Sequence, residues 1–133
     1  MNWLFKEEPS SYSFDDFAKD GKATWSGVKN PVAQKHLHAV KRGDLVFYYH
    51  TGNEKAVVGI AKATGDAYAD PKDKTGKAAV VDVAPVRRLA HPVTLAAIKA
   101  DPSFKTFALV RISRLSVMPV TDAEWRRIEK MSE

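Results

Sequence analysis

The sequence predicts one mixed α+β domain over residues 1–133, with a small, curved, antiparallel or mixed β-barrel of about five or six strands and short helices at its flanks. Short segments rich in β-branched and aromatic residues outnumber the helical segments. The helical segments lie before, between and after the strands, which is typical of an α+β arrangement. The length, with 44% apolar and 28% charged residues, suits a single folded domain.

The first third of the chain predicts one strand and two helices, over residues 3–5, 13–19 and 30–43. The strand is the apolar triplet Trp-Leu-Phe. Ser13 and Asp16 have the spacing of a capping box, which opens a helix. Asn30 is a good helix cap, and the proline after it suits the first helical position because its missing N–H would be unpaired there anyway. Gly43 supplies the stop of the second helix.

The middle of the chain predicts three strands, over residues 45–49, 56–63 and 79–86. The first is a short apolar run of β-forming residues, as expected of a core strand. Gly59 indicates a bulge or a close approach of the backbone, and Pro85 indicates an edge or a bulge. The polar, turn-rich residues 70–77 predict a long hairpin connection rather than a domain boundary.

The last third predicts a short helix over residues 95–100, two further strands over 107–112 and 115–118, and a C-terminal helix. The final helix begins with the capping box of Thr121 and Glu124 and has Trp125 and Ile128 on one face.

Several classes of protein are excluded or disfavoured. There is no cysteine, so disulfides, thiol nucleophiles and cysteine zinc sites are excluded. The sequence has no phosphate-binding glycine loop and no esterase or zinc-protease motif, and His36 and His38 point to different sides of their helix. We expect no metal and no cofactor. No apolar run is long enough to span a membrane, and the N-terminus does not resemble a signal peptide, so we expect a cytoplasmic monomer without a membrane partner.

The net charge of +5 suits a polyanionic partner. Lysines and arginines come in short groups with acidic residues between them, so no tail or arm carries the charge. If DNA or RNA binds, we expect it to dock on a folded face.

The aromatic residues are the best candidates for a binding pocket. Trp25 follows no helical or strand periodicity, and its small neighbours Ser26 and Gly27 leave backbone groups free to approach a base edge. An indole is a broad stacking surface for a base. Core packing explains Trp25 equally well from these observations alone. Residues 49–51 end a strand, and Tyr68 lies just before the polar loop.

Motifs in order along the chain resemble those of a known family. They are Trp3-Leu4-Phe5-Lys6-x-Glu8-Pro9, Tyr12-Ser13-x-x-Asp16, Trp25-x-Gly27-Val28-Lys29-Asn30-x-x-Ala33, Gly43-Asp44-x-x-x-x-Tyr49-His50-Thr51 and Gly59-Ile60-Ala61. The chain resembles the EVE domain, a PUA-like fold similar to the YTH readers of methylated adenine. The resemblance implies a small β-barrel and a pocket for a flipped, modified base, with 5-methylcytosine and related bases as the expected ligands.

The resemblance also implies site residues. Trp25 would stack on the base, and Tyr68 would form part of the opposite wall of the pocket. The other base-binding residues would contact the edge of the base. The base-binding set is Trp25, Ser26, Gly27, Lys6, Tyr49, His50, Thr51, Tyr68 and Asn30, and the expected phosphate contacts are Lys29, Lys72 and Lys74. Asn30 is also expected to cap a helix, and we rank this structural role above a contact with the base. Glu7 departs from the small hydroxyl residue of many relatives, and an acid facing the pocket would repel phosphate and change the preferred base.

The leading hypothesis is therefore a non-catalytic reader that binds DNA or RNA. An alternative is a nucleobase amidohydrolase similar to the ASCH branch of the PUA-like fold, with Lys6, Thr51 and Glu8 as its lysine, threonine and acid. A third is a protein-binding adaptor.

Overall fold

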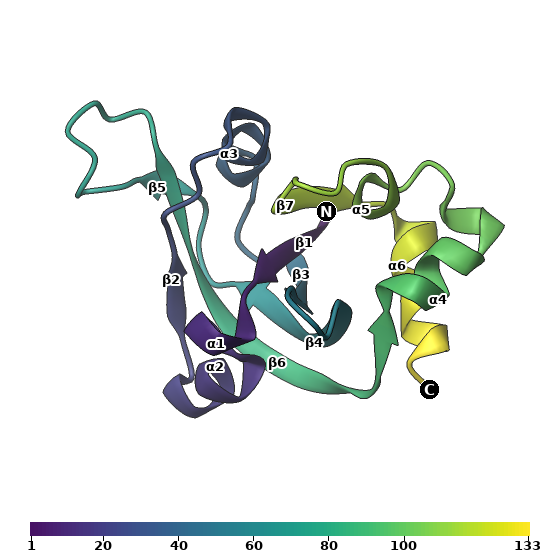
Figure 1. Cartoon of the computed structure of the whole chain (residues 1–133). Coiled ribbons are helices and arrows are strands. Elements are labelled where there is room, and N and C mark those ends of the chain that lie inside the picture. The colour runs from purple at the N-terminus through teal and green to yellow at the C-terminus, as the bar shows by residue number, and fades with distance from the viewer.

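The computed structural model describes all 133 residues and consists of one curled sheet with short helices on both sides (Figure 1). The strands are β1 (Asn2–Glu7), β2 (Ala23–Trp25), β3 (Leu45–His50), β4 (Ala56–Ala63), β5 (Tyr68–Ala69), β6 (Ala79–Thr94) and β7 (Val117–Val120). The helices are α1 (Pro9–Tyr12), α2 (Phe14–Asp20), α3 (Pro31–His38), α4 (Leu95–Ala100), α5 (Ala108–Arg111) and α6 (Asp122–Met131), and a 3₁₀ turn, η1, covers Pro102–Phe104. No helix is long and apolar enough to cross a membrane.

The sheet has the strand order β2-β6-β4-β3-β1-β7, and β5 pairs with β6 outside this path. Only β1 and β3 run parallel; the other neighbours are antiparallel. This arrangement confirms the predicted mixed, curved sheet with flanking helices. In Figure 1, β6 sweeps from the side of β2 and β5 to the start of α4. The register of β6 against β4 shifts at Gly59 and again near Pro85, as expected of bulges at these residues.

The two faces of the central strands meet different partners. Side chains alternate along a strand, so neighbouring residues point to opposite faces. Phe5 and Tyr48 contact Trp25 on one face, where α1 and α2 also pack. Phe47 stacks on Trp125 of α6 on the other face. Figure 1 shows the same division, with α1, α2 and β2 on one side and α4, α5 and α6 on the other.

The predicted strand over residues 107–112 is wrong. These residues form α5, in which the N–H groups of Val110 and Arg111 donate to the carbonyl of Phe107. Phe107 and Leu109 are buried two positions apart, which imitates the periodicity of a strand. The sheet edge beside β1 is occupied instead by β7, so residues 107–112 have no strand to pair with.

Several other predicted boundaries also differ from the structure. The strand expected over residues 79–86 continues to Thr94, because β4 supplies partners as far as Ala56. The strand expected over 115–118 lies at Val117–Val120. The helix expected over 30–43 ends at His38, where Ala39 caps it.

Asp44 fixes the start of β3 to the start of β1. Its carboxylate accepts hydrogen bonds from the indole N–H of Trp3 (2.9 Å), the backbone N–H of Lys41 (2.9 Å) and the N-terminal amine (3.1 Å). Burial alone would raise the pKa of Asp44, but the three donors together hold the pKa below its ordinary value. The carboxylate therefore stabilises the fold in its charged form.

We expect the free energy of unfolding to decrease as the pH is lowered, because the carboxylate of Asp44 becomes protonated. Because the folded-state pKa is depressed, the contribution of Asp44 is complete above the unfolded-state pKa of about 3.9 and is lost as pH falls through the folded-state pKa. Asp44→Asn should cost about 1–3 kcal/mol at pH 7 and less at pH 3, where part of the contribution is already lost. Urea denaturation of both proteins at the two pH values measures this, and an equal cost at both would contradict it.

Candidate nucleic-acid interface

Trp25 lies at the last position of β2, directly before an exposed loop. The indole packs against the rings of Phe5 and Tyr48, with centroids 5.2 and 5.5 Å away, and only 7% of the residue is exposed. The backbone of β2 is fixed by pairing with β6, with Trp25 opposite Val81. Core packing of Trp25 is therefore confirmed, and a base can stack only on the part of the indole that the core leaves free.

The loop after Trp25 turns sharply at Gly27. Gly27 has a φ of +75°, a conformation that other residues rarely adopt, and both it and Ser26 are exposed. The loop ends at Asn30, whose side-chain oxygen accepts the N–H groups of Val32 and Ala33 at 2.9 and 3.0 Å. Asn30 is therefore the N-cap of α3, as ranked first from the sequence, and Ser26 and Gly27 stay beside the indole.

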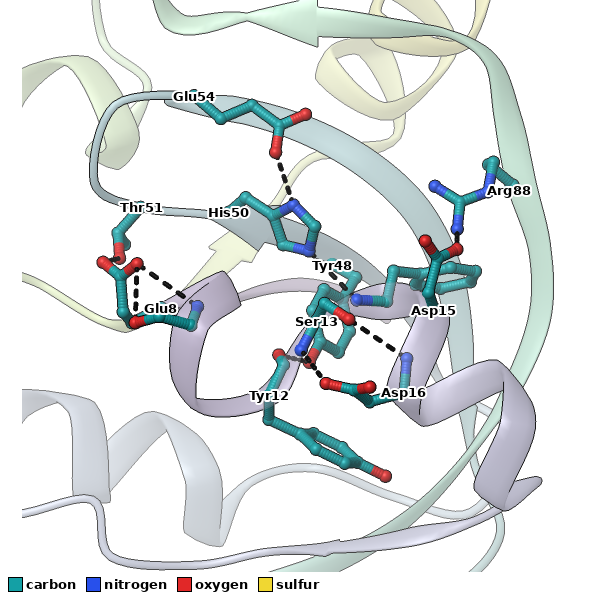
Figure 2. A network of polar contacts seen from close by, with 12 residues as sticks. Glu8, Tyr12, Ser13, Asp15, Asp16, Tyr48, His50, Thr51, Glu54 and Arg88 are labelled. Atoms are coloured by element: carbon teal, nitrogen blue, oxygen red, sulfur yellow. Dashed lines mark hydrogen bonds and ion pairs between the residues drawn. The ribbon is translucent and has the colours of Figure 1, made fainter.

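His50 is engaged by the protein at both ring nitrogens (Figure 2). Its Nε2 accepts the backbone N–H of Phe14 at 3.0 Å, and its Nδ1 lies 2.6 Å from the Glu54 carboxylate. Since Phe14 must donate to Nε2, the proton of the neutral ring sits on Nδ1 and is donated to Glu54. His50 was expected to contact the edge of the base, but in the structure both of its ring nitrogens have protein partners. The residue anchors the start of α2.

The helices α1 and α2 form a cover that is fixed by polar contacts to β3 and β6 (Figure 2). The Tyr48 hydroxyl donates to the carbonyl of Tyr12, and Arg88 forms an ion pair with Asp15. Ser13 and Asp16 make both hydrogen bonds of the predicted capping box. The cover places the rings of Phe14 and Phe17 on Tyr48, which itself supports Trp25.

Glu7 lies on the same face of β1 as Phe5, and so on the Trp25 side of the sheet. One carboxylate oxygen accepts the N–H of Glu8 at 3.0 Å. Burial raises the pKa of Glu7, and the neighbouring charge of Glu8 acts in the same direction. Burial also raises the pKa of Tyr48, and the negative charge of Glu7 contributes to the rise. A carboxyl group, that of Glu7, therefore lies near the aromatic rings of Phe5, Trp25 and Tyr48.

Tyr68 joins the same side of the molecule through Asp82. The Tyr68 hydroxyl donates to Asp82 at 2.9 Å, and Thr24, the neighbour of Trp25, donates to the same carboxylate oxygen at 2.8 Å. The residue is 43% exposed, so the ring is open to solvent. The shared carboxylate therefore links Tyr68 to Thr24 of β2, and the second aromatic wall stays a prediction.

Lys6, Tyr49 and Thr51 lie elsewhere. Lys6 follows Phe5 in β1, so its side chain points away from Trp25. The three residues line one cavity of about 310 Å³, to which Trp25, Ser26 and Gly27 do not contribute. The predicted base-binding residues therefore divide between the two faces of the sheet.

The residues of the alternative enzyme are partly assembled at this cavity. The Thr51 hydroxyl donates to Glu8 at 3.1 Å. The Lys6 ammonium instead donates to the carbonyl of Ser113 at 2.9 Å and lies over the ring of Tyr49. Burial lowers the pKa of Lys6.

The expected phosphate contacts lie on exposed loops, and one of them belongs to a larger basic surface. Lys29 follows Gly27, and Lys72 and Lys74 lie in the loop after β5. Lys29 shares an open groove with Lys35 and Lys77, which were not among the expected phosphate contacts. The side-chain oxygen of Gln34 accepts the N–H of Ala79 and so holds α3 against the start of β6. Nothing in the local sequence signals this long-range contact.

Comparison with known proteins gives consistent matches over the whole chain. A family profile described as the EVE domain matches residues 1–131. An NMR structure of a protein from Rhodopseudomonas palustris is 46% identical, covers 98% of this chain and 92% of its own, and superposes with a TM-score of 0.94. Human thymocyte nuclear protein 1 is 28% identical over 99% of this chain and 74% of its own length.

A crystal structure of the human protein, THYN1, was solved in complex with DNA containing 5-methylcytosine. It is 27% identical to this chain, covers 99% of it and 97% of its own chain, and has a TM-score of 0.90. An ASCH protein from Zymomonas mobilis superposes with a TM-score of 0.54 at 11% identity, which shows a likeness of fold alone.

Proposed function

The chain belongs to the EVE domain family, and on that basis we propose that it binds DNA and holds a modified cytosine, 5-methylcytosine or a related base, against Trp25. The observation that carries the proposal is the close superposition, over nearly the whole chain, on THYN1 in complex with DNA that contains 5-methylcytosine. The place of Trp25, at the end of a fixed strand and beside an exposed loop, supports the same conclusion.

The base leaves the DNA stack and enters beside Trp25. Unstacking and unpairing cost a few kcal/mol, and stacking on an aromatic side chain returns about 1–3 kcal/mol. Backbone groups of Ser26 and Gly27 supply hydrogen bonds to the base edge. Carboxylates accept from the exocyclic amine of cytosine, so Glu7 is suited to read that amine.

Entry of the base requires the loop over residues 26–30 to move. Trp25 is 7% exposed, which leaves too little indole surface for a full stack. The loop is exposed at most positions, and it is tied to α3 by the hydrogen bond from Gln34 to the carbonyl of Val28 and by the capping bonds to Asn30 at its end. Binding is therefore coupled to displacement of this short segment, while the strand below it stays paired.

The groove of Lys29, Lys35 and Lys77 holds the phosphates that flank the base. It begins in the same loop as the base site, and its cationic groups neutralise phosphate and release counterions. Lys72 and Lys74 extend this basic surface along the loop after β5. These contacts position the strand without reading its sequence.

The test is a titration of labelled oligonucleotides that differ at one central base. We expect 5-methylcytosine to bind at least about fourfold more tightly than cytosine, since burying one methyl group contributes about 0.8 kcal/mol. Both affinities should fall with added salt, but their ratio should not. DNA and RNA, single- and double-stranded, are compared at one salt concentration. Equal affinity for the modified and plain bases in every context would refute the proposal.

Hydrolysis of an acylated nucleobase remains the second candidate because Thr51 and Glu8 are hydrogen-bonded beside Lys6. We favour the reader, since Lys6 donates to Ser113 and the resemblance to the ASCH protein extends to the fold alone. Release of acetate from N4-acetylcytidine would distinguish the two.

A further inference from the structure

We propose that the cavity behind β1, lined by Lys6, Tyr49, Lys55 and Lys99, binds a phosphate monoester that carries an apolar or aromatic body. This site is separate from the base site at Trp25, because Lys6 and Phe5 point to opposite faces of one strand. The cavity measures about 310 Å³, which is at the lower end of small-ligand sites.

The cavity has a concentration of unpaired positive charge. Lys6, Lys55 and Lys99 line it, and none of the three takes part in an ion pair. No acidic residue lines it, and the carboxylate of Glu8, which accepts from the lining residue Thr51, also accepts from Ser10. Like charges around a partly enclosed space raise the local potential, and a doubly charged anion offsets it.

Tyr49 provides a donor that the fold does not use. The residue is only 3% exposed and lines the cavity, yet its hydroxyl has no hydrogen-bond partner in the protein. The other buried tyrosine, Tyr48, donates to a backbone carbonyl. Burial raises the pKa of Tyr49, so the phenol remains protonated and able to donate to a phosphate oxygen. No buried side-chain oxygen or nitrogen lacks a partner, so the Tyr49 hydroxyl reaches the surface of the cavity, where a ligand can accept its hydrogen bond.

The remaining walls favour an apolar body next to the phosphate. Leu95 and Leu109 line the cavity together with Tyr49 and the lysines. Lys55 is the only residue other than glycine with a positive φ, at +46°, and its carbonyl accepts the N–H of Leu95 at 2.7 Å. Such strained residues gather at ligand sites. A phosphorylated aromatic compound satisfies both the charged and the apolar side of the cavity.

The experiment is isothermal titration of the full chain with phenyl phosphate, which has the required chemistry and no nucleobase. We expect saturable binding, with phenol at least tenfold weaker. Tyr49→Phe should weaken binding about tenfold, as should Lys55→Gln combined with Lys99→Gln. Lys105→Gln is the matched control because it removes an exposed lysine outside the cavity.

Two further ligands distinguish between a free nucleotide and a DNA end as the source of the phosphate. Adenosine 5′-monophosphate tests a free nucleotide, and an oligonucleotide with a 5′-phosphate, compared with its 5′-hydroxyl form, tests a DNA end. Binding of either that is weakened by Tyr49→Phe supports the site. Absence of binding by all three phosphates would overturn the proposal, and so would a double lysine variant that loses no more affinity than Lys105→Gln. Trp25→Phe should leave phenyl phosphate binding unchanged, so this result does not depend on the reader function.

Discussion

Trp25→Ala is expected to abolish the preference for 5-methylcytosine and to weaken base-dependent binding by about 5- to 150-fold, the loss of one stacking contact of about 1–3 kcal/mol. The same change removes an indole packed on Phe5 and Tyr48, so the free energy of unfolding should fall by about 3–5 kcal/mol. Salt-sensitive background binding through the lysines should persist. Oligonucleotide titration and urea denaturation measure the two effects.

Because Trp25 serves both packing and the proposed stacking, the control must match its burial. Trp125 is 5% exposed, against 7% for Trp25, and stacks on Phe47 on the other face of the sheet. Trp125→Ala should destabilise the protein by a similar amount and keep the base preference. Trp25→Phe should retain part of both properties. If Trp125→Ala abolishes the preference too, Trp25 acts through the fold and not through contact with the base.

Gly59→Ala is expected to lower the free energy of unfolding by about 3 kcal/mol and the Tm by about 10 °C. A Cβ at this position in β4 would lie 2.6 Å from Cζ of Phe14, far inside van der Waals contact. The ring cannot easily retreat. It packs edge-on against Phe17 and Tyr48, Arg88 lies over it, and its backbone N–H is held by His50. Thermal denaturation measures the effect.

Gly65→Ala is the matched control for this substitution. A Cβ at Gly65 would have no atom within 4 Å, and the residue has no unusual φ, so alanine there should change the free energy of unfolding by no more than about 0.5 kcal/mol. Adding Phe14→Leu to Gly59→Ala should recover part of the loss if the ring is the cause. A double variant that loses the sum of both single effects would show that the clash is not with Phe14.

Features set by short-range contacts were predictable from the sequence. The capping boxes at Ser13 and Thr121 and the cap at Asn30 are complete within four residues, and all three form as expected. The close backbone approach at Gly59 was also indicated, although its partner, Phe14, lies in a distant segment. The helix α5 was missed because its buried residues alternate as they would in a strand.

The separation of the predicted base-binding residues onto two faces of the sheet could not be predicted. It depends on which face of the sheet each segment packs against. Alternation along β1 separates Phe5 from Lys6, but the side on which Trp25 lies is decided by the pairing of β2 with β6. The sequence likewise gives no sign that Glu54 and Phe14 occupy both nitrogens of His50. The Tyr68 hydroxyl donates to Asp82 of the neighbouring strand β6, and its role as a wall of the base pocket stays a prediction.

The pairing of β1 has a consequence for how the chain folds. β1 lies between β3 and β7, so its residues near the N-terminus are completed by Val117–Val120, with Trp3 opposite Pro119. Such a distant pairing gives a high contact order, and folds of this kind take milliseconds to seconds rather than microseconds. Until β7 docks, one edge of an apolar strand stays unpaired and open to other chains. The pairing of β7 with β1 therefore also protects the protein against aggregation.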